Sequence, residues 1–439
     1  MSWEKVKLAD LCSVITKGTT PSNIGASFTP IGINYIRSEM VTASKYISST
    51  GMLYISRETH EKLKRSQLQV GDILFSMAGV YLGKTAILRY EDVPANTNQA
   101  VALIRTVPEK CYREYIYYFL NSPNIIKSVN TITSQSAQPN INLTQIGNIE
   151  IVLPPIETQK KIADILSAYD DLIENNQKQI KLLEEAAQRL YKEWFIDLHF
   201  PGYESTPIIN GIPQGWKKEN LGSIAPILTG KKDANFGTED GKYPFFTCSQ
   251  EPIKAPSYSF DTSAVILAGN GDFNVKLYRG KFEAYQRTYV LSPNEEQYLY
   301  LLYYAVTDNM AKFIKGASGS TIKFLTKGMI ENVSLFIPNR DILIQFNTFM
   351  ESIQCKIECL KLSIINATEA RDRLLPKLMN GEIKVGMDKQ ETAKKDNFDY
   401  IRQHWKDVPY DEDLPLAARS TGDISEETLE KLKEIAEEE

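Results

Sequence analysis

The sequence predicts an α+β fold in which two mixed α/β domains are each followed by a long helix. Segments near the ends of the first domain recur in the second half of the chain, the segments between them have the pattern of short strands, and two long segments carry a heptad repeat. The expected parts are a first domain at 1–154, a helix with a linker at 155–200, a second domain at 201–338, a helix at 339–383 and a tail at 384–439.

The internal repeat divides the chain. Trp3-Glu-Lys-Val-Lys-Leu8 returns as Trp216-Lys-Lys-Glu-Asn-Leu221, and the segment from Leu143 to Pro154 returns, two residues longer, from Leu325 to Pro338. Beyond these prolines an offset of 184 residues continues without a gap through both long segments. The chain therefore has the order domain, helix, domain, helix and tail.

Short apolar runs separated by Gly, Asn and Pro predict a mainly β structure inside each domain. The expected strands include Asp72–Phe75 and Ala100–Ile104 in the first domain, and Ala264–Leu267 and Thr288–Leu291 in the second. Each domain also has one segment rich in Tyr and Leu, at 112–121 and 296–307, for which we expect a helix.

The two long segments have apolar residues at alternating steps of four and three, which is typical of the a and d positions of a coiled coil. Each long segment has one such seam, which is apolar except for Asn176 in the first and Arg371 in the second. The first seam comprises Ile162, Leu166, Tyr169, Ile173, Asn176, Ile180, Leu183, Ala187, Leu190 and Trp194. The second seam, 184 residues later, comprises Phe346, Met350, Ile353, Ile357, Leu360, Ile364, Ala367, Arg371, Leu374 and Leu378. We expect the two helices to pair, with Asn176 as a polar residue that sets the register. The pattern leaves parallel and antiparallel pairing open, because a whole domain connects the helices.

Charge and composition favour a globular protein of ordinary composition. The net charge is −5. Residues 384–439 have a net charge of −7, and residues 1–383 have a net charge of +2. Because the body of the chain is nearly neutral, a nucleic-acid site would depend on the local placement of basic groups. No apolar run is long enough for a membrane span or a signal sequence, and we expect a cytoplasmic protein without membrane contact. The five scattered cysteines predict reduced thiols.

The motifs of common enzymes are missing from the sequence. His60, His199 and His404 lie far apart without metal-ligand spacing, which predicts no metal site. The segment Ala78-Gly-Val-Tyr-Leu-Gly83-Lys84-Thr85 resembles a phosphate-binding loop, but a proline at position 94 leaves little room for the helix that should follow. We therefore interpret the segment from Gly79 to Thr85 as a turn.

The ordered motifs of residues 3–383 resemble the specificity subunits of type I restriction–modification systems. The resemblance rests on the two Trp-containing openings, Gly71-Asp-Ile-Leu74, Gln138-Pro-Asn-Ile141, Leu153-Pro-Pro-Ile-Glu-Thr-Gln159 and Leu374-Leu-Pro-Lys-Leu-Met-Asn-Gly-Glu-Ile383. No single motif is specific, but their order and duplication are.

This resemblance implies a non-catalytic subunit that reads double-stranded DNA, with no catalytic residue and no cofactor of its own. It implies two target-recognition domains, each reading half of a split target, and an intramolecular antiparallel coiled coil that fixes the unread spacer. The seam of 33 residues is about 50 Å long, or about 14–15 base pairs. The implied partners are two methyltransferase subunits, which hold S-adenosylmethionine and methylate adenine, and restriction subunits when present.

Two features depart from the family pattern. Arg371 interrupts the second seam, and we expect its guanidinium to face solvent or a partner. The acidic tail lies outside the resemblance. Asp423-Ile-Ser-Glu426 predicts the start of a terminal helix. Otherwise we expect a solvated extension, and the alternative is a tail that contacts a partner subunit or restrains the chain itself.

DNA bases are read mainly by Arg, Lys, Asn and Gln, while Ser, Thr and backbone amides position phosphates. The candidate DNA-binding residues are polar positions in predicted loops. They are Lys17, Thr19, Thr20, Arg37, Lys84, Asn98, Gln99, Ser134, Gln135 and Gln138 in the first domain, and Lys231, Lys232, Asn270, Lys276, Arg287, Ser318, Ser320, Thr321 and Lys323 in the second.

Three alternatives remain open from the sequence. The chain could be a coiled-coil scaffold whose domains bind proteins, a nucleotide-dependent enzyme that uses Lys84, or a solitary specificity-like subunit without its own methyltransferase. Salt-dependent DNA binding argues against the first, and ATP turnover abolished by Lys84→Ala would support the second. A neighbouring methyltransferase gene argues against the third.

Overall fold

A computed structural model describes residues 3–42, 44–133, 140–319 and 323–385. The terminal helix expected after position 423 lies outside these residues. The chain forms two compact units, and both boundaries fall inside long helices, between Gln177 and Lys178 and between Lys361 and Leu362. Each unit is described separately below.

The described residues of the first unit form ten strands and four short α-helices, together with parts of the two long helices. The strands are β1 (Glu4–Lys7), β2 (Cys12–Lys17), β3 (Phe28–Thr29), β4 (Ile33–Ile36), β5 (Leu53–Ile55), β6 (Ile73–Ser76), β7 (Thr85–Ile87), β8 (Ala95–Thr97), β9 (Val101–Thr106) and β10 (Glu150–Leu153). The short helices are α1 (Arg57–Lys62), α2 (Arg113–Leu120), α3 (Pro123–Thr133) and α4 (Leu143–Gly147). The strands form sheets in the orders β2-β9-β6-β7, β3-β5-β4-β8 and β1-β10.

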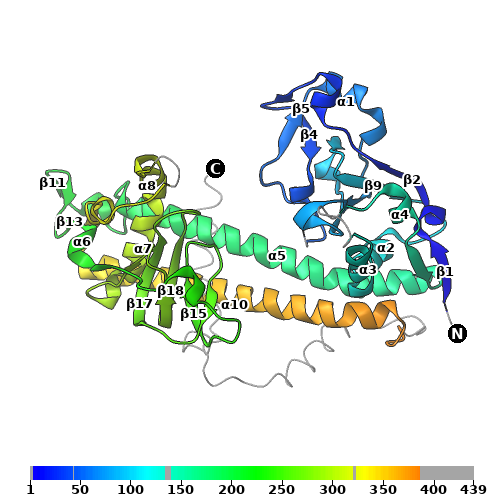
Figure 1. The fold of residues 1–439 in the computed structure, drawn as a ribbon. Helices are drawn as coiled ribbons and strands as arrows, with labels where there is room; N and C mark the ends of the chain where they lie inside the picture. The colour runs from blue at the N-terminus through cyan, green and yellow to red at the C-terminus, as the bar shows by residue number, and fades with distance from the viewer. Residues whose placement is uncertain (1–2, 43, 134–139, 320–322, 386–439) are drawn as a thin grey trace. The chain divides into compact units, whose positions relative to one another are not determined.

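The second unit is built around a six-stranded sheet of order β14-β19-β17-β18-β15-β16. Its strands are β11 (Ile208–Ile209), β12 (Ile212–Pro213), β13 (Lys217–Asn220), β14 (Ile227–Thr229), β15 (Tyr243–Phe246), β16 (Ile253–Ala255), β17 (Phe260–Ala268), β18 (Val275–Ala284), β19 (Thr288–Leu291) and β20 (Ser334–Ile337). Its short helices are α6 (Leu221–Ile224), α7 (Leu299–Asp308), α8 (Met310–Gly316) and α9 (Lys327–Glu331). Helix α7 lies along β17 and β18 (Figure 1).

The repeated sequence segments form the same structure in both units. The opening strand pairs antiparallel with the strand before the long helix, as β1 with β10 and as β13 with β20. The next residue is a fully buried leucine in each case, and its backbone N–H donates to a carbonyl across the pair: Leu8 to Ile149 at 2.9 Å and Leu221 to Val333 at 2.8 Å. The repeat therefore encodes a closure that brings the two ends of each domain together.

The motif around Gly71 and Asp72 is a structural turn. Gly71 has φ +87, and Asp72 is 1% exposed. One Asp72 carboxylate oxygen accepts from the backbone N–H of Gln69 at 2.7 Å, and the carboxylate pairs with Arg105 of β9 at 2.7 Å. A buried charge paired in this way anchors the loop that leads into β6.

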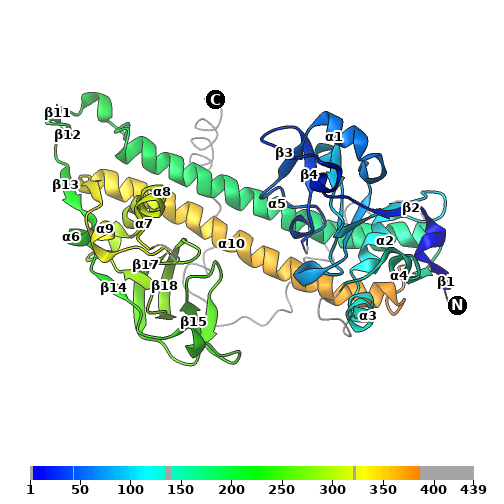
Figure 2. The same ribbon diagram turned by 45° about the horizontal axis from the view of Figure 1, so that its top comes forward.

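The long helices are α5 (Ile156–Phe195) and α10 (Arg340–Met379), as the heptads predict. In the first unit Asn176 donates to Ser363 at 2.9 Å, and in the second the Trp194 and Phe346 rings lie 5.9 Å apart. A residue further along α5 therefore meets one earlier on α10, so the pairing is antiparallel; Figure 2 shows the two helices side by side. The implied antiparallel coiled coil is confirmed.

Apolar residues of the seam fill the core of each unit. Ile162 and Leu166 in the first unit, and Phe346 and Met350 in the second, are fully buried. Asn176 is 4% exposed, which agrees with its expected position inside the seam. No helix among the described residues is long and apolar enough to cross a membrane. All five cysteines are free thiols.

The expectation for Arg371 is wrong. Its guanidinium forms an ion pair of 2.6 Å with Asp170 of α5, and a second pair of 2.8 Å with Asp372. Its side chain is only 18% exposed. The buried Asp170 carboxylate attracts the guanidinium into the helix pair, and the sequence of α10 alone does not show this partner.

Candidate nucleic-acid interface

In the first unit, a close backbone approach gathers several candidate residues at the end of β2. The Gly18 N–H donates to Asn98 O and the Thr19 N–H to Thr97 O, both at 3.1 Å. A Cβ atom at Gly18 would lie 1.7 Å from Thr97 O, so glycine alone permits this approach. It places Lys17, Thr19 and Thr20 beside Asn98 and Gln99.

Side-chain contacts connect these two segments further. The Thr20 hydroxyl donates to the Gln99 side chain, and the Tyr35 hydroxyl donates to Thr19 O at 3.1 Å. Asn98 accepts from the Ala100 N–H at 3.1 Å, so part of its amide serves the loop itself. Gln99 is exposed and Lys17 is half-buried, which leaves polar groups accessible at this edge.

Arg37 follows β4, which runs parallel to β8 and so brings Arg37 beside Asn98. The Arg37 guanidinium pairs with Glu39 at 2.7 Å and donates to Gly51 O at 3.2 Å. These contacts hold the half-buried side chain to its own domain. To contact DNA, Arg37 would have to leave these partners or use its remaining N–H groups.

Lys84 lies at the end of the turn between β6 and β7. The Lys84 ammonium is 5.0 Å from the centre of the Tyr81 ring, and its carbonyl accepts from the Ser76 N–H at 2.8 Å. Strand β7 begins at once with Thr85, at the place where a phosphate-binding loop would lead into a helix. The interpretation of this segment as a turn is confirmed.

The turn between β6 and β7 is joined to the other candidate loops through the backbone. The Met77 N–H donates to Ala100 O at 2.8 Å, and Ala78 forms a β-bridge with Asn140. The segment just before Asn140 contains Ser134, Gln135 and Gln138, which lie outside the described residues.

Lys64 and Arg65 were not among the residues predicted from the sequence. Both are exposed, and Arg65 donates to the Thr19 hydroxyl at 3.4 Å. They belong to the basic run Lys62-Leu-Lys-Arg65, a signal that was available in the sequence. Two further cations therefore flank the cluster around Thr19.

The second unit repeats the glycine approach. The Gly230 N–H donates to Thr288 O at 3.2 Å, and a Cβ at Gly230 would lie 1.9 Å from Ala284 O. Lys231 and Lys232 follow directly in the sequence. Lys231 is exposed, and Lys232 forms a β-bridge with Tyr285. The Lys232 ammonium lies 4.4 Å from the centre of the Phe236 ring.

A second loop of this unit carries Asn270 and contacts the segment of Arg287. The Gly269 N–H donates to Arg287 O at 2.8 Å, and the Cys248 thiol lies 2.8 Å from the Asn270 amide oxygen. Asn270 also forms a β-bridge with Phe324. This arrangement parallels the bridge between Ala78 and Asn140 in the first unit.

The remaining candidates of the second domain differ in accessibility. The Lys276 ammonium donates to Ser249 O at 2.9 Å and to the Asn274 side chain, and burial lowers its pKa. Lys323 is exposed, and Ser318 exchanges two backbone hydrogen bonds with Phe324. Ser320 and Thr321 lie outside the described residues.

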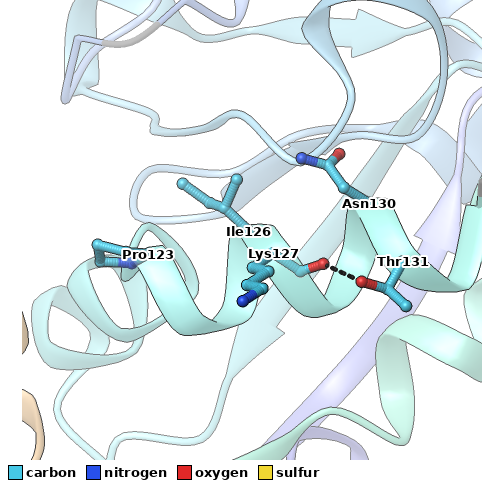
Figure 3. Close-up of a pocket in the computed structure, with 5 residues that line it drawn as sticks. All are labelled: Pro123, Ile126, Lys127, Asn130 and Thr131. Carbon is cyan, nitrogen blue, oxygen red and sulfur yellow. Dashed lines mark hydrogen bonds between the residues drawn. The ribbon is translucent and has the colours of Figure 1, made fainter.

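The hollow on α3 is a weaker candidate. Pro123, Ile126, Lys127, Asn130 and Thr131 line it, and the Thr131 hydroxyl donates to Lys127 O at 2.8 Å (Figure 3). All five residues belong to one helix, so no side chains from other elements converge on a ligand there. Among the described residues, no group of three His, Cys, Asp or Glu side chains is placed to hold a metal ion.

Two domains that each expose polar and basic loops, joined to a pair of long helices, define a class of modular recognition protein. The family model for the type I restriction modification DNA specificity domain matches residues 1–185 and 213–360. The chain belongs to this family. The two matched ranges correspond to the two copies of the internal repeat.

Curated relatives and a solved structure are similar to this chain. It is 38% identical over 178 residues to the EcoDI specificity subunit of Escherichia coli, covering 39% of each chain. It is 27% identical over 416 residues to the MjaIX specificity subunit of Methanocaldococcus jannaschii, covering 87% of this chain and 94% of that one. The S subunit structure from M. genitalium aligns with a TM-score of 0.55 at 16% identity, over 86% of this chain and 96% of that one, and so shares the fold.

Proposed function

We propose that this chain is the non-catalytic subunit that reads a bipartite DNA target in a type I restriction–modification complex. Each domain reads one half of the target, and the helix pair sets the unread gap. The observation that carries this proposal is the repeated loop arrangement, in which Gly18 and Gly230 each bring a basic segment against a second polar loop.

The two copies of this arrangement belong to units that include different parts of the same long helices. The first unit takes the N-terminal part of α5 and the second unit its C-terminal part. A continuous helix shared by two readers is a suitable spacer, because an α-helix is stiff over tens of ångströms.

The chemistry would come from partners. Two methyltransferase subunits supply S-adenosylmethionine and transfer its methyl group to adenine, and restriction subunits join when present. The complex works in the cytoplasm. Contacts from the partners add to the binding energy, since residues 1–154 and 201–338 carry net charges of only +4 and +1.

A genome-wide map of methylated bases tests this function, with the gene intact and with the gene deleted. The proposal predicts that a gapped two-part adenine motif disappears on deletion and returns when the gene is restored. Purification of the complex provides the second readout. A motif map unchanged by deletion, in cells where the chain co-purifies with an active methyltransferase, would contradict the proposal.

A further inference from the structure

In each domain, a tyrosine hydroxyl donates a hydrogen bond to a carboxylate on the long helix that follows the domain. In the first unit Tyr118 of α2 donates to Asp170 of α5 at 2.5 Å. In the second unit Tyr300 of α7 donates to Glu351 of α10 at 2.5 Å. The tyrosines are 2% and 4% exposed, so both side chains are buried.

An arginine completes each group of three residues, but the two arginines come from different elements. Arg371 of α10 pairs with Asp170 at 2.6 Å, so the first group joins a domain to both long helices. Arg279 of β18 pairs with both oxygens of Glu351, at 2.9 and 3.0 Å, so the second group joins two elements of the domain to its helix. Hydrogen bonds to charged groups are strong and directional, and a bidentate arginine also fixes the angle of approach.

The same turn of helix is used in both units. Glu351 lies 184 residues after Ser167, whose hydroxyl lies 3.3 Å from the Tyr118 oxygen and accepts a hydrogen bond from Lys45 at 3.1 Å. Lys45 is 8% exposed and also pairs with Asp171 at 3.6 Å. Each domain is therefore held at an equivalent place on its helix by a cation and a tyrosine.

In the second group of three residues, the surroundings of Glu351 favour its ionised carboxylate. Burial raises the pKa of the Glu351 carboxyl, but hydrogen bonds from Arg279 and Tyr300 and the charge of Arg279 outweigh this effect and hold the pKa below its ordinary value. The carboxylate is therefore an ionised acceptor at neutral pH, which keeps both of its donors aligned.

We propose that these two groups are latches that fix the orientation of each domain on its helix, and that the choice of gap length in the DNA target depends on them. This inference rests on the function proposed above. One additional base pair moves the second half-site by about 3.4 Å and turns it by about 35°. A domain that rotates freely on its helix could turn to meet the displaced half-site. A domain that is fixed to its helix could not, so the complex would bind poorly to a target with the altered gap.

The second latch is the better one to test, because the Arg279 and Glu351 side chains are 35% and 49% exposed and their loss leaves the apolar core intact. The variants are Arg279→Ala, and Tyr300→Phe, which removes one hydroxyl. Arg279→Lys retains the charge without the bidentate geometry. The matched control is Arg373→Ala, which removes an exposed pair with Glu369 on the same helix.

The assay uses cells that express the full chain with its methyltransferase. A plasmid library carries the two half-sites of the wild-type methylation motif, separated by the natural gap and by gaps up to two base pairs shorter or longer. The readout is the ratio of methylation at the natural gap to methylation at each altered gap. A lower amount of folded protein reduces methylation at all gaps together, so this ratio reports orientation and not abundance.

The latch predicts that Arg279→Ala lowers this ratio roughly fivefold, that Tyr300→Phe lowers it less and that Arg279→Lys restores part of it. The bases read in each half-site stay unchanged, and Arg373→Ala behaves as wild type. A wild-type ratio retained in both Arg279→Ala and Tyr300→Phe would overturn the latch alone. A wild-type complex that shows no bipartite motif would overturn the proposed function and the latch with it.

Discussion

Gly18 illustrates how a single residue determines where the candidate interface forms. The approach of its backbone to Thr97 and Asn98 leaves no room for a side chain, and Gly230 has the same role in the second unit. Neither glycine has a positive φ, so the requirement comes from space and not from backbone conformation.

We expect Gly18→Ala to destabilise the first unit by about 2–4 kcal/mol, because the loops carrying Thr19 and Asn98 must separate. Chemical denaturation of the purified full chain, followed by hydrogen exchange in residues 12–20 and 95–101, measures this. Gly328→Ala is the control, since a Cβ there meets nothing within 4 Å. Unchanged exchange in both segments would contradict the close-approach argument.

Lys231 is exposed immediately after the glycine of the second unit, and we predict that it contacts a DNA phosphate. Lys231→Ala should weaken binding of the assembled complex to all sequences and reduce the slope of log affinity against log salt by about one. Titrations at several salt concentrations measure the slope. Lys181→Ala on α5 is the control, and an unaltered slope for Lys231→Ala would remove this residue from the interface.

Residue-level prediction from sequence succeeded only in part. The loops that carry Lys17, Asn98 and Lys231 could be found from polar residues at strand ends. The hydrogen bonds from Lys276 to Ser249 O and from Arg37 to Gly51 O could not be predicted from the sequence, because each joins two separate segments of the chain. Whether each candidate binds DNA stays a prediction.

At the scale of elements, the heptads predicted both long helices, and short apolar runs predicted strands such as β6, β9, β17 and β19. The direction of helix pairing did not follow from the heptads, since either direction buries the same apolar positions. Long-range pairs such as Asn176 with Ser363 determine it in the fold. The resemblance to specificity subunits supplied the antiparallel arrangement beforehand.

Arg371 was misplaced for the same reason: its partner Asp170 belongs to the other helix. We expect Arg371→Ala to cost about 3 kcal/mol, because it removes the cation that pairs with a buried carboxylate. Hydrogen exchange of the amides in residues 362–379 should increase. The double variant Asp170→Asn with Arg371→Met should recover most of the protection, and an Arg371→Ala variant with wild-type exchange would show that the pair contributes little.

At the scale of the whole molecule, the helix pair is proposed to act as the spacer between the two half-sites. Inserting one heptad after Gln177 in α5 and another before Leu362 in α10 preserves the apolar seam and adds about 10.5 Å. We expect the unread gap to lengthen by about three base pairs. Methylation mapping reads the gap directly, and an unaltered gap in an active variant would exclude the helix pair as the spacer.

The division of labour between the two domains is the central claim, and a domain exchange tests it most directly. Residues 216–338 would be replaced by the corresponding domain of a family member with a different motif, and methylated bases would be mapped across the genome. The account predicts that one half of the motif changes to that of the donor while the other half remains. A motif in which both halves change, or neither does, in an active complex would contradict the claim that each domain reads its own half.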